Sequence, residues 1–244
     1  MNQSSQKRIL VDEIFGPTLQ GEGPMVGMPV VFVRTGGCDY RCSWCDTLHA
    51  VLPRNRKEWR AMTASNILDE VKQLSNDPLW VVVSGGNPAL QPLEELLRSG
   101  QQQGYRFALE TQGSIVPDWF GQIDHLTLSP KPPSAGMETD WSALKKAVEI
   151  AKTGCAHLKV PVLNQADLSF VADLRKRHPE LPLTLQPVNA GAQSGALQDD
   201  DNALHEKLME QMRWLHEQVV ARHWYDVRVL PQLHVMIWGT GRGV

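Results

Sequence analysis

The sequence predicts an α/β fold in which parallel strands alternate with helices. Three observations support this prediction: short runs rich in valine, leucine and isoleucine recur along the chain, longer amphipathic segments separate them, and the short runs are apolar throughout. A strand followed by a helix, repeated several times, makes successive strands parallel and joins them by crossovers. Uniformly apolar strands indicate that helices cover the sheet.

Each element is predicted from its own pattern. The strands are short β-branched or leucine-rich runs, and the helices carry apolar residues three or four positions apart, as Ile67, Val71 and Leu74 do in the first of them. The stretch 189–201 is rich in Gly, Gln and Asp and is predicted to be a loop or lid. The predicted strands are VVFVR at 30–34, WVVVS at 80–84, FALE at 107–110, HLTL at 125–128, LKVPV at 158–162, LTLQ at 183–186 and VRVL at 227–230; the predicted helices are 64–74, 93–102, 141–151, 165–177 and 205–221.

Length and composition limit the classes of protein. The 244 residues are 42% hydrophobic, which suits one core, so a single domain over 1–244 is expected. A net charge of −3 without any run of Lys and Arg argues against nucleic acid as a partner. We expect no membrane association and a cytoplasmic location, because the chain start lacks an apolar signal segment and no apolar run could span a bilayer. Reduced cytosolic thiols favour metal ligation over disulfides.

Three cysteines follow the first predicted strand. Cys38, Cys42 and Cys45 stand four and three positions apart in GGCDYRCSWCDT. A closed cluster or a structural zinc site normally takes four protein ligands. Three thiolates would leave one iron of a four-iron cluster open to a substrate or cofactor, so the spacing points to chemistry at that position.

Other uses of these cysteines remain open at this stage. Zinc could bind the three thiolates together with His49, four residues past the last of them. Disulfides within such a short run would close very small loops and leave one cysteine over. The fourth cysteine, Cys155, is distant in sequence and is predicted to be a small buried residue.

Polar and glycine-rich residues follow several predicted strands at their carboxyl ends. Parallel α/β folds form their active sites at that edge of the sheet. Glycines there allow a ligand to approach the main chain closely. The sequence therefore predicts a site formed together with the cysteine loop by SGGNP at 84–88, ETQG at 110–113, SPK at 129–131 and QP at 186–187.

These motifs together resemble a known family. The run CDYRCSWC at 38–45, combined with the Gly-Gly turn at 85–86, resembles the radical S-adenosylmethionine (radical SAM) enzymes. The run TLQGEG at 18–23, Arg34 and CDT at 45–47 resemble, within that superfamily, the 7-carboxy-7-deazaguanine synthases of queuosine biosynthesis. The resemblance extends through SPK, Gln186-Pro187 and PQLH at 231–234, and so covers nearly the whole chain.

The resemblance implies a fold, a reaction and cofactors. The fold would be a partial, open (β/α) TIM-like barrel with its active site at the carboxyl mouth. The enzyme would be a carbon–nitrogen lyase that uses a [4Fe-4S] cluster, S-adenosylmethionine and Mg²⁺. A 5′-deoxyadenosyl radical would abstract hydrogen from 6-carboxy-5,6,7,8-tetrahydropterin, whose ring contracts with loss of ammonia to 7-carboxy-7-deazaguanine. Such a radical must be shielded from water.

The resemblance also implies roles for single residues, while no catalytic residue is assigned. Asp46 would lie next to the magnesium ligand. The implied sites are the cluster ligands Cys38, Cys42 and Cys45; the magnesium ligand Thr47; the S-adenosylmethionine contacts Trp44, Gly85, Gly86, Asn87, Ser129, Pro130, Lys131 and Gln186; and the substrate contacts Leu19, Gln20, Gly21, Glu22, Arg34, Ser84 and His234.

One position departs from the superfamily pattern. Many of these enzymes have Gly-Gly-Glu-Pro, whose carboxylate can receive the methionyl ammonium, whereas this chain has Asn87. If Asn87 contacts the cofactor, Asn87→Glu should be tolerated and Asn87→Leu should weaken S-adenosylmethionine binding.

Partners follow from the same resemblance. It implies a flavodoxin or ferredoxin as electron donor and a homodimer, which would also cover the open edges of the sheet. Two alternatives remain: a radical activase that acts on a glycine of a partner enzyme, which shares the cysteine spacing, and a noncatalytic zinc or cluster protein.

Overall fold

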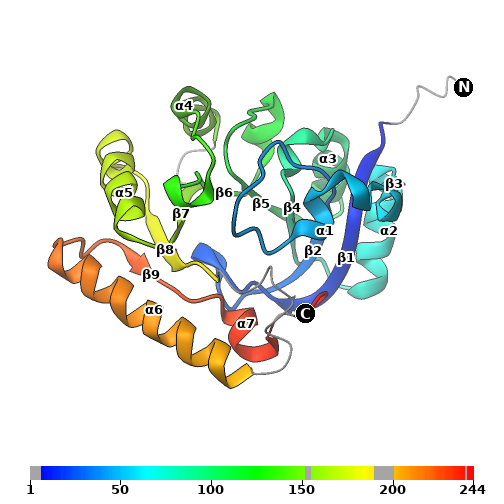
Figure 1. The fold of residues 1–244 in the computed structure, drawn as a ribbon. Helices are drawn as coiled ribbons and strands as arrows, with labels where there is room; N and C mark the ends of the chain where they lie inside the picture. Colours follow the sequence, from blue (N-terminus) through cyan, green and yellow to red (C-terminus); the bar gives the residue numbers. More distant parts are fainter. Residues whose placement is uncertain (1–6, 152–154, 190–200, 240) are drawn as a thin grey trace, which may run out of the picture.

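A nine-stranded sheet wraps around an open interior, with the longer helices on its outside (Figure 1). The computed structural model describes residues 7–151, 155–189, 201–239 and 241–244. The strand order is β3-β1-β2-β4-β5-β6-β7-β8-β9, and all neighbours from β2 to β9 are parallel. The strands are β1 (Ile9–Leu19), β2 (Pro29–Thr35), β3 (Arg60–Met62), β4 (Trp80–Gly85), β5 (Arg106–Thr111), β6 (His125–Leu128), β7 (Ala156–Val162), β8 (Leu183–Pro187) and β9 (Arg228–Val229).

The helices agree closely with the pattern of apolar residues. Two of them, α2 and α5, begin and end at the predicted residues, and α6 begins four residues earlier than predicted. Each of α2, α4 and α5 begins at a side-chain cap, supplied by Thr63, Asp140 and Asn164. The α-helices are α1 (Leu48–Val51), α2 (Ala64–Leu74), α3 (Glu94–Gln102), α4 (Trp141–Ile150), α5 (Gln165–Arg177), α6 (Asp201–Ala221) and α7 (Leu233–Trp238); the 3-10 turns are Gly23–Met25, Pro53–Glu58, Pro88–Leu90, Asp118–Gln122 and Pro133–Ala135.

The sheet confirms the open, partial barrel and adds an edge that the pattern did not predict. Strand β1 pairs antiparallel with both β2 and β3, so it extends the parallel set on one side. Asp12, Glu13 and the Gly16-Pro17 pair interrupt its apolar residues, and the pairing with β2 is irregular between Val11 and Glu13 and between Phe15 and Thr18. The cysteine loop therefore follows the second strand of the chain, which is the first of the parallel set.

Two other predictions need comment. The predicted strand at 227–230 is reduced to the two residues of β9. Most of the predicted loop at 189–201 lies outside the described residues. No helix in the described part of the chain is long and apolar enough to cross a membrane.

Side chains of each parallel strand alternate between two environments. On β2, Val31 and Val33 pack into the large core beneath the helices, whereas Val30 and Phe32 join a small apolar cluster with Met25, Val82 and Ala108. Two residues further along each of these strands, the next side chain on the inward face is polar: Arg34 follows Phe32 on β2, and Ser84 follows Val82 on β4. On β5 Glu110 follows Ala108 in the same way, and on β7 Lys159 follows His157. The interior is thus apolar around the small cluster and polar at the carboxyl ends of the strands.

Candidate functional site

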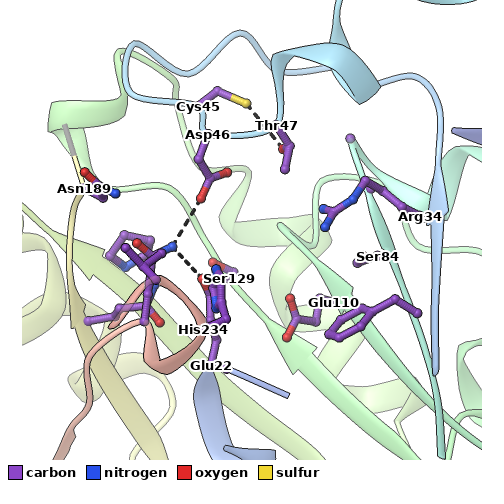
Figure 2. Close-up of a pocket in the computed structure, with 18 of the residues that line it drawn as sticks. Glu22, Arg34, Cys45, Asp46, Thr47, Ser84, Glu110, Ser129, Asn189 and His234 are labelled. Carbon is purple, nitrogen blue, oxygen red and sulfur yellow. Dashed lines mark hydrogen bonds between the residues drawn. The ribbon is translucent and has the colours of Figure 1, made fainter. Parts of the chain in front are cut away.

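A cavity of ≈ 310 Å³ occupies the carboxyl mouth of the sheet. It is lined by the cysteine loop, by the ends of the parallel strands, by the residues after β1 and by the chain end. Figure 2 shows Cys45 from the cysteine loop, Glu110 and Ser129 from strand ends and Glu22 from the segment after β1 around it. Nearly all residues singled out in the sequence therefore meet in one place. The predicted site residues that line it are Leu19, Gln20, Gly21, Glu22, Arg34, Cys38, Cys42, Trp44, Cys45, Thr47, Ser84, Gly85, Gly86, Ser129, Lys131, Gln186 and His234.

Two predicted residues do not line the cavity. Pro130 is buried between Ser129 and Lys131, which do. Asn87 is fully buried behind the Gly-Gly turn, with its side chain bonded to other protein groups. In this structure the Asn87 side chain is not part of the cavity lining, and its contact with the cofactor stays a prediction.

The cysteine loop brings three free thiols to the cavity wall. Cys38, Cys42 and Cys45 are half-buried, and their sulfur atoms do not all lie within 4.8 Å of one another. A single zinc ion with Zn–S bonds of about 2.3 Å would hold its sulfurs about 3.8 Å apart. Nor do these thiols form a compact ligand group with His49, whose Nδ1 is 2.7 Å from Asp12 Oδ2. The arrangement of these thiols therefore does not match a single tetrahedral zinc ion.

The electrostatics of the thiols suit a site that is completed by a cation. Burial raises the pKa of all three thiols, that of Cys42 to about 11, and neighbouring thiols contribute to the rise at Cys38 and Cys42. Thiolates are the metal-binding form, so bound iron must supply the free energy of deprotonation. The main-chain N–H of Tyr40 already points at Cys38 Sγ at 3.4 Å, a bond that would stabilise the ligated thiolate.

The loop is held in shape by the segment after β6. The main-chain N–H of Ser43 donates to the Ala135 carbonyl at 2.9 Å, and its hydroxyl donates to the Ser134 carbonyl at 2.7 Å. Trp44 donates its indole N–H to the Ser134 hydroxyl at 3.0 Å, which fixes the ring at the cavity wall. Tyr40 donates to the Glu138 carbonyl at 2.6 Å. These contacts hold the cysteine loop against the segment after β6.

Ser129 and Lys131 form a compact polar group at the end of β6. The Lys131 ammonium donates to the Ser129 carbonyl at 3.0 Å and to its hydroxyl at 2.9 Å. Burial lowers the pKa of Lys131. A half-buried cation whose hydrogen-bond partners are both neutral favours an anion in the cavity, such as the carboxylate of an amino acid.

Buried polar atoms without partners mark further places for a ligand. Ser84 Oγ, Gln186 Oε1 and Gln232 Oε1 are buried at the cavity and have no hydrogen-bond partner in the protein. Such groups cost free energy when they are left unsatisfied. Two of them, Ser84 and Gln186, were predicted to contact ligands.

A buried ion-pair group lies opposite the cysteine loop. The Lys159 ammonium bonds to Glu22 Oε2 and lies 3.5 Å from Glu110 Oε2. Burial alone would lower the pKa of Lys159, but Glu110 and Glu22 outweigh it and raise the pKa above its usual value. Burial would raise the pKa of Glu22, yet Lys159 and then His234 hold it well below its usual range. Both partners are therefore charged.

This group is connected to the residues on either side of it. Gln20 donates from Nε2 to Glu110 Oε1 at 2.9 Å. Gln232 donates to Glu22 Oε1 at 2.7 Å and to Asp46 Oδ2 at 3.2 Å, as the dashed lines of Figure 2 show. Hydrogen bonds thus link the ion-pair group to Asp46, the residue after Cys45. Thr47 lies beside this point, with its hydroxyl 3.7 Å from Cys45 Sγ.

Several main-chain groups in the segment after β1 already form hydrogen bonds within the protein. The N–H of Gln20 donates to the Met28 carbonyl and its carbonyl accepts from Gly27, both at 2.8 Å. The Gly21 carbonyl accepts from Leu233 at 2.8 Å, and a Cβ on Gly21 would lie 2.1 Å from His234 Nδ1. This close approach explains why position 21 is a glycine. The hydrogen bond from Leu233 holds α7, and with it His234, at the cavity.

Arg34 is aligned by a carboxylate on the neighbouring strand. Its Nε donates to Glu13 Oε1 at 2.7 Å, and its guanidinium lies over the Phe15 ring, 5.6 Å from the centroid. The two terminal nitrogens then remain for a second, bidentate acceptor. Figure 2 shows the guanidinium directed into the cavity near Ser84.

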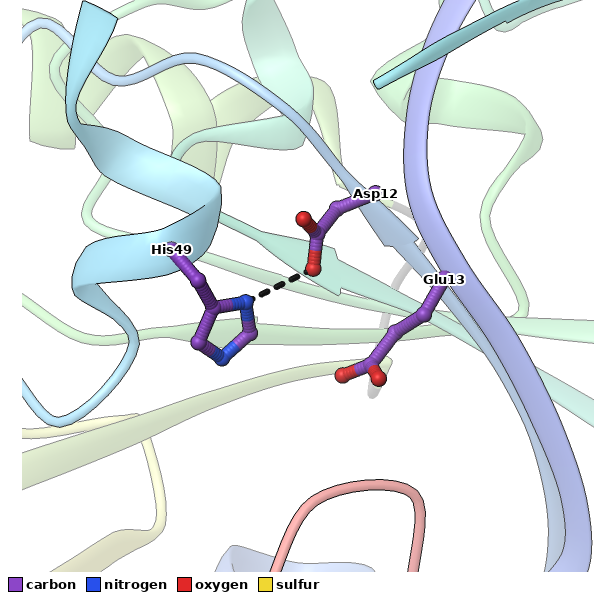
Figure 3. A group of neighbouring side chains, drawn as sticks. All are labelled: Asp12, Glu13 and His49. Atoms are coloured by element: carbon purple, nitrogen blue, oxygen red, sulfur yellow. Dashed lines mark hydrogen bonds and ion pairs between the residues drawn. The ribbon is translucent and has the colours of Figure 1, made fainter. Parts of the chain in front are cut away.

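Asp12, Glu13 and His49 form a compact group (Figure 3), which is joined to Arg34 through Glu13. Their potential ligand atoms all lie within 4.8 Å, but each carboxylate also pairs with a guanidinium. Arg242 Nη2 lies 3.2 Å from Asp12 and 3.5 Å from Glu13, and Arg34 pairs with Glu13. The group is therefore an ion-pair network that holds Arg34 and the chain end.

The sequence patterns missed several cavity residues. Lys159 was concealed in a strand that looks apolar, because only alternate side chains of that strand face inward. The signal that could have found it is period-two alternation. Glu110, Gln112 and Gln232 lie in motifs that the sequence singled out, ETQG and PQLH, but no ligand contact was assigned to them. Asn189 also lines the cavity, at the start of the predicted loop 189–201.

Comparisons with known proteins agree with this geometry. The Radical SAM superfamily profile matches residues 32–133. A 7-carboxy-7-deazaguanine synthase from Bacillus cereus is 40% identical over 240 residues, covering 97% of this chain and 99% of that protein. One from Bacillus subtilis is 42% identical over 245 residues, covering 98% and 99%.

Solved structures show the same fold. The crystal structure of QueE from Escherichia coli superposes with a TM-score of 0.68 at 25% identity, covering 93% of this chain and 95% of that one. Streptococcus suis SuiB, at 13% identity and a TM-score of 0.57, shares the fold over 87% of this chain and 51% of its own.

Proposed function

The chain belongs to the 7-carboxy-7-deazaguanine synthase family of radical SAM enzymes, and we propose that it converts 6-carboxy-5,6,7,8-tetrahydropterin to 7-carboxy-7-deazaguanine with loss of ammonia. One observation carries the proposal: a single cavity combines three thiols on one wall with charged groups of both signs on the other. The substrate needs both signs, because it has a carboxylate at one end and a guanidine-like edge at the other.

The three thiols suit a [4Fe-4S] cluster because they follow one another closely in one loop and because the cavity lining holds no fourth cysteine, which leaves one iron open. When bound, the cluster and S-adenosylmethionine supply a 5′-deoxyadenosyl radical. The task of Cys38, Cys42 and Cys45 is to hold three irons, while the surrounding walls exclude water.

Residues at the strand ends form the S-adenosylmethionine site. The Gly85-Gly86 turn offers its main chain to the methionyl group, since a Cβ at either position would meet β2 or the cysteine loop at 2.2 Å and only glycine fits there. Lys131 pairs with the methionyl carboxylate, and Ser129 and Gln186 reach the polar part of the nucleoside. Trp44, fixed by Ser134, packs near the adenine.

The opposite wall binds the pterin. Arg34, held through Nε by Glu13, pairs its two free nitrogens with the substrate carboxylate. Glu22 accepts from the guanidine-like edge, and Lys159 keeps it ionised for that purpose. Ser84 donates from its unpartnered hydroxyl, and the side chain of His234 lies beside Glu22. Leu19, Gln20 and Gly21 form the adjoining wall.

Magnesium completes the substrate site in this proposal. The Thr47 hydroxyl and the Asp46 carboxylate lie at the same corner of the cavity, and Gln232 connects Asp46 to Glu22. An oxygen donor set with room for water suits Mg²⁺. Thr47 would ligate the ion, and Asp46 would add negative charge beside it.

Radical SAM proteins take electrons from a reductant, and we propose a flavodoxin or ferredoxin for this one. We also propose a cytoplasmic homodimer with a single domain over 1–244. Sedimentation that shows only monomer at working concentration would contradict the dimer.

Anaerobic reconstitution separates this function from its alternatives. Iron and sulfide in the protein, with reductive cleavage of S-adenosylmethionine in the absence of any partner protein, would exclude a noncatalytic zinc protein. Turnover of the carboxy-tetrahydropterin would exclude a glycyl radical activase. A protein that cleaves S-adenosylmethionine but leaves the pterin unchanged would refute the proposed substrate.

A further inference from the structure

Asn87 uses its whole hydrogen-bonding capacity inside the protein. Its amide Nδ2 donates to Asp39 Oδ1 at 2.8 Å and to the Ser114 hydroxyl at 3.3 Å. Its Oδ1 accepts from the Thr111 hydroxyl at 2.8 Å and from the Ala89 N–H at 3.1 Å. Two donors and two lone pairs are all that an asparagine amide has. The residue is 0% exposed, so nothing remains for a ligand in the cavity.

Asp39 is the charged centre of this group. Besides Asn87, its carboxylate accepts from Gln112 Nε2 at 2.7 Å and from the Ser114 hydroxyl at 2.6 Å. These donors come from the ends of β4 and β5, whereas Asp39 belongs to the cysteine loop. Three hydrogen bonds to one carboxylate therefore fasten the loop to two strands of the sheet.

The group acts directly on the first cysteine of the loop. Asp39 follows Cys38, and Gln112 Nε2 lies 3.7 Å from Cys38 Sγ while it bonds Asp39. The main-chain N–H of Asn87 donates to the Gly37 carbonyl at 2.7 Å, on the other side of the cysteine. Cys38 is thereby held from both of its neighbours and through its sulfur.

We propose that Asn87 is a positioning residue that fixes Cys38 through Asp39, and that it is not a contact of S-adenosylmethionine. The inference rests on the proposed role of Cys38 as a cluster ligand. It also accounts for the departure from Gly-Gly-Glu-Pro. A glutamate at position 87 would set a second carboxylate against Asp39 and would remove both amide donors, so Asn87→Glu is disfavoured in this chain.

Exchanging the two groups tests the pairing. Asn87→Asp creates two facing carboxylates, Asp39→Asn leaves two facing amides, and the double variant restores one amide and one carboxylate in reversed positions. In the double variant the amide nitrogen at position 39 can take the place of Asp39 Oδ1 and donate to the carboxylate at position 87, and Gln112 can turn its own amide so that its oxygen accepts the second N–H. The carboxylate at position 87 can in turn accept from Thr111 and from the N–H of Ala89. The contacts between the two positions and with these three neighbours can then form again.

The readout is amide hydrogen exchange of residues 37–46 in the cluster-free protein, so it does not depend on turnover. We expect Asn87→Asp to accelerate exchange about tenfold and the double variant to return it to within about threefold of the native rate. Iron bound per chain after reconstitution should fall in Asn87→Asp and recover in the double variant.

Two results would overturn the proposal. One is a double variant whose exchange is no slower than that of Asn87→Asp. The other is an Asn87→Asp protein with native exchange and iron content but weaker S-adenosylmethionine binding by calorimetry, because that pattern requires direct contact. If Asn87→Asp does not fold, Ser114→Ala removes a single donor to Asp39. Unchanged exchange of residues 37–46 in that variant would equally contradict the inference.

Discussion

Replacing Lys159 by methionine leaves two carboxylates without their cation. The Lys159 side chain is 7% exposed, and those of Glu22 and Glu110 are 15% and 21% exposed. Methionine has a similar length and keeps the apolar packing of the stem. The perturbation is therefore almost purely the loss of one positive charge and its hydrogen bonds.

The magnitude follows from this burial. Breaking a buried ion pair from one side costs about 3–5 kcal/mol, because the remaining charge stays desolvated. Because the carboxylates are partly exposed, we expect Lys159→Met to lower the free energy of unfolding by about 3 kcal/mol, near the lower end of this range. In Lys159→Met/Glu22→Gln the more buried carboxylate is also neutralised, while Glu110 keeps its bond from Gln20. We expect the double variant to be more stable than Lys159→Met by about 2 kcal/mol.

Urea denaturation of the cluster-free protein at neutral pH measures these differences. Lys145→Met is the matched control, since Lys145 is 72% exposed and lies 3.7 Å from Glu149 on the surface of α4. That pair should contribute less than about 0.5 kcal/mol. The reasoning is refuted if Lys159→Met costs no more than Lys145→Met, or if adding Glu22→Gln destabilises it further.

Three further predictions concern pH, substrate binding and metal. Burial, then His125 and Arg228, lower the pKa of His157 from 6.5 to about 4. The neutral, buried imidazole therefore contributes its full stabilisation of the fold above about pH 6.5, and this contribution is lost as the pH falls toward 4. The free energy of unfolding should drop by about 2 kcal/mol more between about pH 7.5 and 5 in the native protein than in His157→Gln, as denaturation at both pH values would show. Glu13→Gln loosens Arg34 and should raise the Kd of the carboxy-tetrahydropterin about fivefold in calorimetry, with bound iron unchanged. Thr47→Val should abolish the response of the initial rate to added Mg²⁺, whereas Thr47→Ser should keep it.

Each of these has a result that contradicts it. Equal pH dependence in His157→Gln would mean that the buried imidazole, bonded to the Thr184 hydroxyl at 2.8 Å, does not titrate as described. Native substrate affinity in Glu13→Gln would show that Arg34 needs no alignment. An undiminished Mg²⁺ response in Thr47→Val would remove that hydroxyl from the metal site.

The parallel part of the fold was predictable because its strands have apolar side chains on both faces. Val81 and Val83 pack under helices while Val82 faces inward, and such runs are distinctive in sequence. Strand β1 was not predictable in the same way. It lies at the antiparallel edge, where Asp12 and Glu13 bind arginines and break the apolar pattern.

The candidate site was predictable in outline, since polar residues at strand ends must meet at one edge of a parallel sheet. Its internal pairing was not. Glu22 and Lys159 are 137 positions apart, and nothing local to either residue indicates the other. Asn87 was assigned to the cofactor from its motif, but its direction depends on Asp39, 48 positions away. Contacts of that kind are set by the fold and not by the local pattern.

The proposed function is tested most directly by one turnover measurement. The reconstituted protein, kept anaerobic with S-adenosylmethionine, Mg²⁺ and a reductant, is given 6-carboxy-5,6,7,8-tetrahydropterin, and the products are identified by mass spectrometry. The account predicts 7-carboxy-7-deazaguanine with one ammonia released for each molecule formed. A cluster-loaded protein that cleaves S-adenosylmethionine and returns the pterin unaltered would contradict it.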